Sequence, residues 1–507
     1  MAQRTSERRR ARQPIFVILL LLAGLAMLVP AAFAFATRDW PTGQIFLSCA
    51  VLFLLGTVIL MLALRGSAPS ESAFSQLLAL VGAYTLLPLV FAVPLWIAAE
   101  EGTISAAWFE MISSFTTTGA TLWAPEELQP ALHLWRALVG WLGGLLIWVS
   151  AMAILAPLSL GGFEVRASRT DASMESRFTQ VSHTAGPYDR LARYIELLAP
   201  VYGALTFALT ILLVLAGNDG FTAFLHALSV MATSGISPTG GPPAQQGGLI
   251  GEVFILLFLS LALSRRVYSA TLPGETLPRL LSDREFSLGL GLIAAASLVI
   301  FLRHWFAGDA ADTLLETGKA FWGALFTVAS FLTTTGFESR YWETAADWSG
   351  LESPGLVLLG LAIFGGGIGT TAGGVKLLRV YALYKHGLRE VEKLIHPSSV
   401  GGSGQEARRI RSGGALIAWV FFMLFALSIA ACLLLLTLAG LSFEDATVLT
   451  IAALTNCGRL AVIAAETPIA YSEVSDPALT VLAAAMVIGR IELLAIIALL
   501  NPEFWRK

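Results

Sequence analysis

Four short stretches of this chain combine hydroxyl or amide side chains with a glycine in a pattern that could bind a cation. They are FTTTGAT (residues 115–121), MATSGIS (231–237), LTTTGF (332–337) and LTNCGR (454–459). Backbone carbonyls that point the same way can replace the hydration shell of a dehydrated cation, and glycine allows the positive φ that such a backbone needs. A single copy would be explained more simply as a turn between helices. Four copies in matching surroundings favour one shared site.

In each stretch, the glycine and the two residues before it are the candidate cation-binding residues. They are Thr117, Thr118, Gly119, Thr233, Ser234, Gly235, Thr334, Thr335, Gly336, Asn456, Cys457 and Gly458. The carbonyl oxygens expected to face the ion are those of Thr118, Gly119, Ser234, Gly235, Thr335, Gly336, Cys457 and Gly458. The threonine hydroxyls are expected to hydrogen-bond behind these carbonyls or to cap the segments.

The elements that must position these residues are membrane helices. The chain has 507 residues, 56% of them hydrophobic and 13% charged, against about 25% charged in ordinary soluble domains. Apolar stretches near the roughly 20 residues that cross a bilayer predict about ten spans. They cover residues 14–35, 45–64, 74–99, 131–158, 191–216, 249–263, 286–306, 355–384, 415–441 and 478–500. We expect the first to be a retained helix, because its apolar run is too long for a signal peptide.

Each Thr/Gly stretch has the same surroundings, which indicates an internal repeat. A full apolar span precedes it, a half-length apolar segment leads into it, and a second span follows. The half-length segments are residues 104–115, 221–232, 319–332 and 443–454. They are too short to cross a membrane, so we expect short re-entrant helices, the last one capped by Ser442 with Asp445. Non-helical backbone at membrane depth is tolerated where it is buried in protein or lines a water-filled cavity.

The distribution of lysine and arginine predicts a cytoplasmic N-terminus and C-terminus. Most of the 32 basic residues fall on one side under that assignment. The loops on that side are 166–193, 265–284 and 376–411. The opposite segments are richer in acids, which would attract cations.

Other chemistries find little support. Cys49, Cys432 and Cys457 have no disulfide or metal-ligand spacing, and the six histidines are scattered, so they are interpreted as surface or core side chains. We therefore expect no structural disulfide, no resident metal site and no enzyme activity.

A glycine-rich run, FGGGIGTTAGGVK (residues 364–376), interrupts the span at 355–384. Glycine costs about 1 kcal/mol in a helix, so the run should break it. It is not a Walker A loop, because Lys376 is not followed by serine or threonine, and its loose dinucleotide-binding pattern follows no strand.

The four stretches resemble the filter loops of the potassium transporter superfamily that includes the Trk, Ktr and HKT proteins. The additional pair of spans before residue 74, the glycine-rich run and the ending GRIELLAIIALLNPEFWR (489–506) resemble the TrkH-type membrane subunit. The resemblance implies an all-α polytopic membrane protein with four parallel span–pore helix–filter–span repeats around one pore, plus two extra N-terminal spans. Because Gly119 is kept where sodium-favouring plant members carry serine, it also implies potassium as the substrate.

The resemblance also implies a gate. In TrkH-type proteins the glycine-rich run is an intramembrane loop that obstructs the pore, and an arginine in the context of Arg490 faces the pore. The gate residues expected are Gly365, Gly366, Gly367, Gly369, Thr370, Thr371, Gly373, Gly374, Lys376 and Arg490. A charge at the depth of Arg490 costs about 2.5–3.5 kcal/mol on insertion scales. The alternative is that Arg490 snorkels to the interface, with Glu492 as its neutralising companion.

The resemblance further implies partners and a location. The membrane subunit would be a homodimer in the bacterial inner membrane, and a cytosolic nucleotide-binding subunit of the TrkA type would dock on the basic loops. No cofactor is expected to be covalently bound, and a nucleotide would act only through that subunit.

These expectations divide the chain into a basic N-terminus, an added pair of spans and four repeats. Their boundaries are 1–13, 14–68, 69–165, 166–280 with cytoplasmic linkers, 281–400 with the glycine-rich loop, and 401–507.

Two departures and two rival functions remain open at this point. Arg459 directly follows the fourth glycine and would repel a cation unless an acid such as Glu466 pairs with it, and Ser234 replaces a threonine. The rival functions are an ion-coupled secondary symporter, which predicts carboxylates inside the spans, and a non-conducting sensor or scaffold. A sodium-permeable member of the same superfamily is a further alternative.

Overall fold

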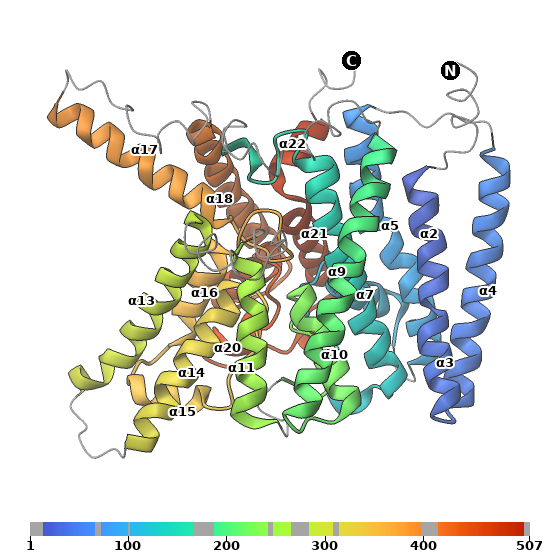
Figure 1. Ribbon diagram of the computed structural model, residues 1–507, viewed down its shortest axis with the longest axis horizontal. Helices are drawn as coiled ribbons and strands as arrows, with labels where there is room; N and C mark the ends of the chain where they lie inside the picture. The colour runs from blue at the N-terminus through green and yellow to red at the C-terminus, as the bar shows by residue number, and fades with distance from the viewer. Residues whose placement is uncertain are drawn as a thin grey trace.

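The computed structural model describes residues 14–65, 72–99, 102–165, 187–241, 247–264, 283–307, 314–396 and 414–500. Within these ranges the protein is built of helices and contains no strand. The predicted N-terminal segment 1–13 and most of the basic loops lie outside the described residues. In Figure 1, α2, α3 and α4 stand at one end of the molecule and α13, α14 and α15 at the other.

Seven helical segments of the described chain are long and apolar enough to cross a membrane, or eight if one bent pair counts as a span. The protein is therefore a multi-pass membrane protein. The seven are α2 with α3 (Ile15–Ala36), α4 (Trp40–Ala63), α5 (Ala73–Ala98), α7 with the π-helical turn η3 (Pro130–Leu155), α9 (Pro187–Leu215), α13 (Arg284–Ala307) and α18 (Gly414–Leu438).

Three of the ten stretches predicted as spans are not single long helices. The stretch 249–263 forms a shorter helix, α11 (Gly248–Leu259), followed by the 3-10 turn η6 (Ser260–Leu263). The stretch 355–384 is broken into α16 (Gly355–Phe364) and α17 (Leu377–Ile395) by the glycine-rich run. The stretch 478–500 bends by 93° between α21 (Asp476–Ile491) and α22 (Leu493–Leu500). Apolar composition alone does not reveal these interruptions, because glycine and a single bend change mean hydropathy little.

The four half-length segments are helices, as predicted. They are α6 (Ile104–Phe115), α10 (Gly220–Ala232), α14 (Leu314–Leu332) and α19 (Phe443–Leu454). Side-chain caps begin three of them: Thr103 for α6, Asp219 for α10 and Ser442 for α19. The predicted cap is confirmed, since Ser442 Oγ accepts a hydrogen bond from the amide of Asp445 at 3.1 Å. Helix α10 begins one residue earlier than expected, and α14 is clearly longer than expected, at 19 residues.

Each short helix packs against the long helix before it and the helix after it in the chain. The pairs are α5 and α7 around α6, α9 and α11 around α10, α13 and α16 around α14, and α18 and α21 around α19. The remaining elements are α15 (Trp342–Ser349), α20 (Leu460–Ile463) and the 3-10 turns η2 (Pro125–Glu127), η4 (Phe163–Val165) and η9 (Tyr471–Glu473). Helix α17 extends away from the other helices at the upper left of Figure 1.

Candidate functional site

The four Thr/Gly stretches leave their short helices with the same backbone geometry. We call residues 117–119, 233–235, 334–336 and 456–458 the first to fourth central segments. In each, the amide just before the glycine donates to the carbonyl five residues earlier: Thr118 to Ser113 at 2.8 Å, Ser234 to Ser229 at 3.0 Å, Thr335 to Ser330 at 2.9 Å and Cys457 to Ala452 at 2.9 Å. The segments therefore share one register relative to their helices.

The first residue of every central segment has a positive φ although none is a glycine. The φ angles are 57° at Thr117, 52° at Thr233, 57° at Thr334 and 54° at Asn456. Such a conformation is uncommon outside glycine and costs on the order of 1–3 kcal/mol. Its presence at four equivalent positions is a strained feature that the surrounding structure holds in place, as is common at functional sites.

The segment glycines follow the expected conformation in three cases. φ is 74° at Gly119, 66° at Gly235 and 76° at Gly336, whereas Gly458 is not at positive φ. The expectation that all four glycines share this conformation is wrong for the fourth. There the amide of Gly458 donates to the carbonyl of Thr118 at 2.7 Å, which fixes a different orientation.

The central segments contact one another in a closed order. A Cβ at Gly119 would collide with the carbonyl oxygen of Ser234, and one at Gly235 would collide with that of Thr335. The Cβ position of Gly336 lies 3.3 Å from Cys457 Sγ. The bond from Gly458 to Thr118 closes the order from fourth to first. The structure thus brings all twelve candidate cation-binding residues into one buried cluster.

Each short helix ends at this cluster. Helices α6, α10, α14 and α19 end one or two residues before their central segments begin. The C-terminal end of a helix carries a partial negative charge, equivalent to roughly half an elementary charge. Four such ends at one buried cluster favour a cation there.

The fourth segment is held by bonds to other elements. Asn456 Nδ2 donates to Thr118 Oγ1 at 3.1 Å and to the carbonyl of Met486 on α21 at 2.9 Å. The hydroxyl of Tyr471 donates to the carbonyl of Gly458 at 3.0 Å. These side-chain contacts tie it to the first segment and to α21.

Arg459 is paired, but with a different acid from the expected one. Its Nη2 lies 3.3 Å from Glu338 Oε1 and donates to the carbonyl of Gly240 at 2.7 Å. Glu466 instead accepts no bond from Arg459, and its backbone amide donates to Glu444 at 3.1 Å. The other departure, Ser234, is accommodated because its hydroxyl lies 3.1 Å from that of Ser229.

The glycine-rich run forms a buried non-helical segment between α16 and α17, as predicted. It contacts the third central segment and the end of α10. Thr371 Oγ1 donates to the carbonyl of Met231 at the end of α10 at 3.2 Å, and the amide of Gly373 donates to Thr334 Oγ1 at 2.7 Å. The amide of Gly367 donates to the carbonyl of Ala262 at 3.0 Å. The segment therefore lies directly against the cluster.

Arg490 lies against the same glycine-rich segment. Its Nη1 donates to the carbonyl of Thr371 at 2.6 Å, and the residue is 4% exposed. The expected companion, Glu492, pairs with Arg379 instead, at 2.7 Å. Of the other predicted gate residues, Thr370 donates to the carbonyl of Gly367 at 2.8 Å and Lys376 Nζ donates to that of Ala372. The ten predicted gate residues are thus brought together.

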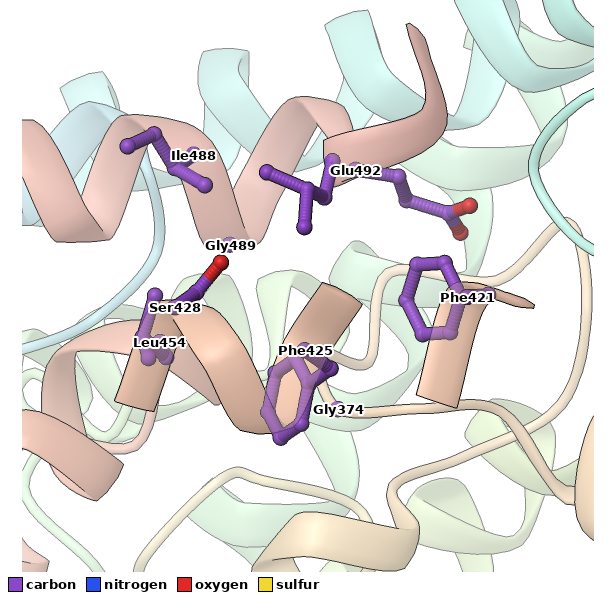
Figure 2. A pocket seen from close by; sticks show the side chains of 9 residues that line it. Gly374, Phe421, Phe425, Ser428, Leu454, Ile488, Gly489 and Glu492 are labelled. Atoms are coloured by element: carbon purple, nitrogen blue, oxygen red, sulfur yellow. The ribbon is translucent and has the colours of Figure 1, made fainter. Parts of the chain in front are cut away.

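A buried charge cluster beside the glycine-rich segment was missed in the sequence analysis. Arg379, near the start of α17, bonds Glu164 and Glu492 at 2.7 Å each and lies 3.8 Å from the ring centre of Phe421. Figure 2 shows Glu492 and Phe421 beside the bend of α21, with Gly374 nearby, around a small cavity. No spacing in the sequence links residues so far apart. The only available signal was that Arg379 and Glu492 lie inside the predicted apolar stretches 355–384 and 478–500.

Buried acids near the central segments were also missed. Glu110 on α6 lies 2.6 Å from Arg136 on α7, and both are nearly inaccessible to solvent. Glu252 on α11 accepts bonds from Trp322, Ser339 and Arg340. The sequence signal was available, since each acid interrupts an apolar helix.

Comparisons with known proteins agree with the resemblance seen in the sequence. Residues 286–506 match the TrkH family, described as a cation transport protein. The chain is 28% identical over 503 residues to the Trk system potassium uptake protein TrkH of Escherichia coli K12, covering 98% of this chain and 99% of that one. It is 29% identical over 504 residues to TrkH of Vibrio parahaemolyticus, covering 97% and 98%. The crystal structure of the potassium transporter TrkH from Vibrio parahaemolyticus matches with a TM-score of 0.81 and 27% identity, covering 97% of this chain and 98% of that one.

Proposed function

We propose that this chain, a TrkH-type membrane protein of the Trk, Ktr and HKT superfamily, takes up potassium ions across the bacterial inner membrane through a selective pore. The pore would run through the cluster of central segments, with four parallel repeats arranged around it and the α2–α4 pair outside them. The relatives named as potassium uptake proteins support potassium as the transported ion.

The observation that carries the proposal is the fourfold backbone pattern of the central segments. Four helix ends, four equivalent hydrogen bonds and four positive φ angles occur at positions that contact one another in a closed order. This arrangement suits a filter, in which carbonyl oxygens replace the water shell of an ion. The carbonyls we assign to potassium are those of Thr118, Gly119, Ser234, Gly235, Thr335, Gly336, Cys457 and Gly458.

The glycine-rich segment would be the gate. It is bonded to the end of α10 and to the third central segment, and Arg490 donates a hydrogen bond to it. A segment of small residues can move aside at little steric cost, and the positive charge of Arg490 next to it would oppose a passing cation. Opening would require the bond from Arg490 to Thr371 to break or shift.

Control of this gate would come from a cytosolic nucleotide-binding subunit of the TrkA type. Helix α17 follows the gate directly and extends away from the other helices (Figure 1), so it offers a mechanical link to such a partner. The basic loops at 166–193 and 385–411, which would receive the partner, lie largely outside the described residues. The assembly would contain two copies of the membrane subunit, with both chain termini in the cytoplasm.

An ion-coupled symporter is the second candidate. It would use titratable groups inside the membrane, and buried acids do exist here, at Glu110, Glu164, Glu252 and Glu492. Each of them is bonded to a basic side chain or to several donors. Acids held in this way suit a structural role better than proton or sodium binding.

The proposal can be tested in a bacterium that lacks its own potassium uptake systems. Expression of this chain, with the cytosolic subunit of the same organism, is expected to restore growth at low external potassium. Growth that is not restored, although the protein is present in the membrane, would contradict the proposal. The control is the same strain without this chain, given additional sodium. If it grows equally well, the assay does not report potassium uptake.

A further inference from the structure

Three of the short helices carry a polar side chain that bonds the residues just beyond the central segment. Each of these side chains lies nine residues before the segment glycine. They are Glu110 in α6, His226 in α10 and Thr327 in α14. Glu110 Oε2 accepts a hydrogen bond from the amide of Leu122 at 2.9 Å. His226 Nε2 lies 2.7 Å from Ser237 Oγ, and Thr327 Oγ1 accepts from the amide of Ser339 at 3.1 Å.

A second position, six residues before the glycine, repeats this arrangement closer to the central segment. It is serine in the same three helices. Ser113 Oγ donates to the carbonyl of Ala120 at 2.7 Å, Ser229 Oγ lies 3.1 Å from Ser234 Oγ, and Ser330 Oγ accepts from the amide of Phe337 at 2.7 Å. All six of these side chains are fully buried.

The fourth short helix has neither contact. Its two equivalent positions are Leu449 and Ala452, which carry no polar side-chain atom. The fourth segment relies instead on Asn456, Tyr471 and its bond to Thr118. The polar positions are therefore confined to three of the four helices.

We infer that Glu110, His226, Thr327, Ser113, Ser229 and Ser330, the brace residues, are positioning residues that set the preference of the pore for potassium over sodium. This inference rests on the proposed function. Apart from the amide bonds back to their short helices, the central segments lack the hydrogen bonds of a helix or sheet, so their carbonyl positions also depend on side-chain bonds from behind. A carbonyl cage that cannot contract fits potassium and fails to dehydrate the smaller sodium ion, whereas a loosened one accepts both.

Two features argue that the brace is more than packing. The outer position carries a carboxylate, an imidazole and a hydroxyl in the three helices, and each chemically different group reaches the same part of its loop. The outer brace is also supported in turn: Arg136 lies 2.6 Å from Glu110, and Glu252 accepts a bond from Ser339 Oγ at 2.8 Å. His226 further lies edge-on to Phe337, which follows the third glycine, with ring centres 5.5 Å apart.

Thr327→Val is the sharpest variant, because valine keeps the shape of threonine and removes only its hydroxyl. Removing one net hydrogen bond should lower the potassium-to-sodium permeability ratio about fivefold, which corresponds to about 1 kcal/mol. Thr327→Ser restores the acceptor and should restore the ratio.

Thr450→Val is the matched control. It makes the same change at a buried position of α19, the short helix without brace residues, and should leave the permeability ratio unchanged. His226→Leu gives α10 the leucine that α19 has at the equivalent position, Leu449. It should lower the permeability ratio about as much as Thr327→Val.

The measurement is the zero-current potential of purified protein in planar bilayers with potassium on one side and sodium on the other. This potential does not depend on how many molecules are folded, so a merely structural loss cannot mimic the result. If the wild type is potassium-selective and both Thr327→Val and His226→Leu keep its permeability ratio, the role of the brace residues is contradicted while the proposed function stands. A wild type without potassium preference would overturn the proposed function itself. A fall in Thr450→Val equal to that in Thr327→Val would also overturn the brace, by showing that any hydroxyl in these helices matters.

Discussion

The first three central segments and the fourth are held in the buried cluster by different kinds of contact. In the first three, side chains of the segment's own short helix bond the segment or the residues just beyond it, through the side chains of Ser234 and Ser237 in the second, and the glycine lies at positive φ. The fourth has apolar residues at those helix positions, its glycine is not at positive φ, and its polar contacts run sideways to Thr118 and to α21.

On the proposed function, this difference would give the segments different roles. Three segments are held by side chains of their own helices, and we assign ion selection mainly to them. The fourth is linked to α21, the helix that also carries Arg490 against the glycine-rich segment and ends at a 93° bend beside Glu492. On the proposed function, the fourth segment would be coupled to the gate through α21 and Arg490, whereas the third segment bonds the glycine-rich segment directly through Thr334.

The largest effect is expected for Arg490→Ala, next to the glycine-rich segment, on the rate of potassium conduction. Two unit charges about 6 Å apart at an effective dielectric near 20 repel by roughly 3 kcal/mol, which slows passage about a hundredfold. The variant should conduct potassium up to about a hundredfold faster with an unchanged permeability ratio. Flux per folded protein in liposomes measures this, with Arg490→Lys as the charge-keeping control. An alanine variant no faster than wild type would show that Arg490 is not a barrier.

The next largest effect is expected for Gly119→Ser, in the first central segment, on the preference for potassium over sodium. The side chain is strained at the φ of 74° and collides with the carbonyl of Ser234, so the neighbouring segment must also move. The potassium-to-sodium permeability ratio should fall about tenfold or more. Gly458→Ser is the matched variant. Its Cβ would lie 2.5 Å from the backbone nitrogen of Ala120 and 2.9 Å from the carbonyl oxygen of Thr118, whereas the Cβ at Gly119 would come still closer to the carbonyl oxygen of Ser234. Because no strain from positive φ is added, a smaller fall is expected. Equal losses at both positions would remove the distinction between the two kinds of segment.

The smallest effect is expected for Tyr471→Phe, which removes the hydroxyl that bonds Gly458. One neutral hydrogen bond contributes on the order of 1 kcal/mol to stability. Since the fourth segment keeps its bonds to Thr118 and to Met486 on α21, the permeability ratio should change by less than about twofold while thermal stability in detergent falls slightly. A loss of selectivity as large as that of Thr327→Val would show that the Tyr471 hydroxyl is as important for selectivity as the brace residues.

Much of this arrangement could be predicted from the sequence because local signals were strong. Helices α6 and α19 begin and end at the predicted residues, since Thr103 and Ser442 cap their starts and the Thr/Gly stretches end them. The break at Phe364 followed from the glycines after it. Helix α14 begins earlier than predicted because the polar residues before Lys319 end the apolar pattern without ending the helix.

The contacts that distinguish the fourth segment could not be predicted. The bonds from Asn456 to Thr118 and from Arg379 to Glu164 join residues hundreds of positions apart, and no local pattern specifies them. The partner of Arg459 was misassigned for the same reason, because Glu466 is near in sequence while Glu338 is near in space. By contrast, the polar residues at equivalent positions of three short helices were visible once the four glycines were aligned. Their role required the distances.

The central claim is that the four central segments form a potassium-selective pore. It is tested most directly by the zero-current potential of the purified wild-type protein between equal concentrations of potassium and sodium chloride. The account predicts a potential of at least about 59 mV in the direction that marks potassium as the more permeant ion, which corresponds to a permeability ratio of ten or more. A conducting protein with a potential near zero would contradict it.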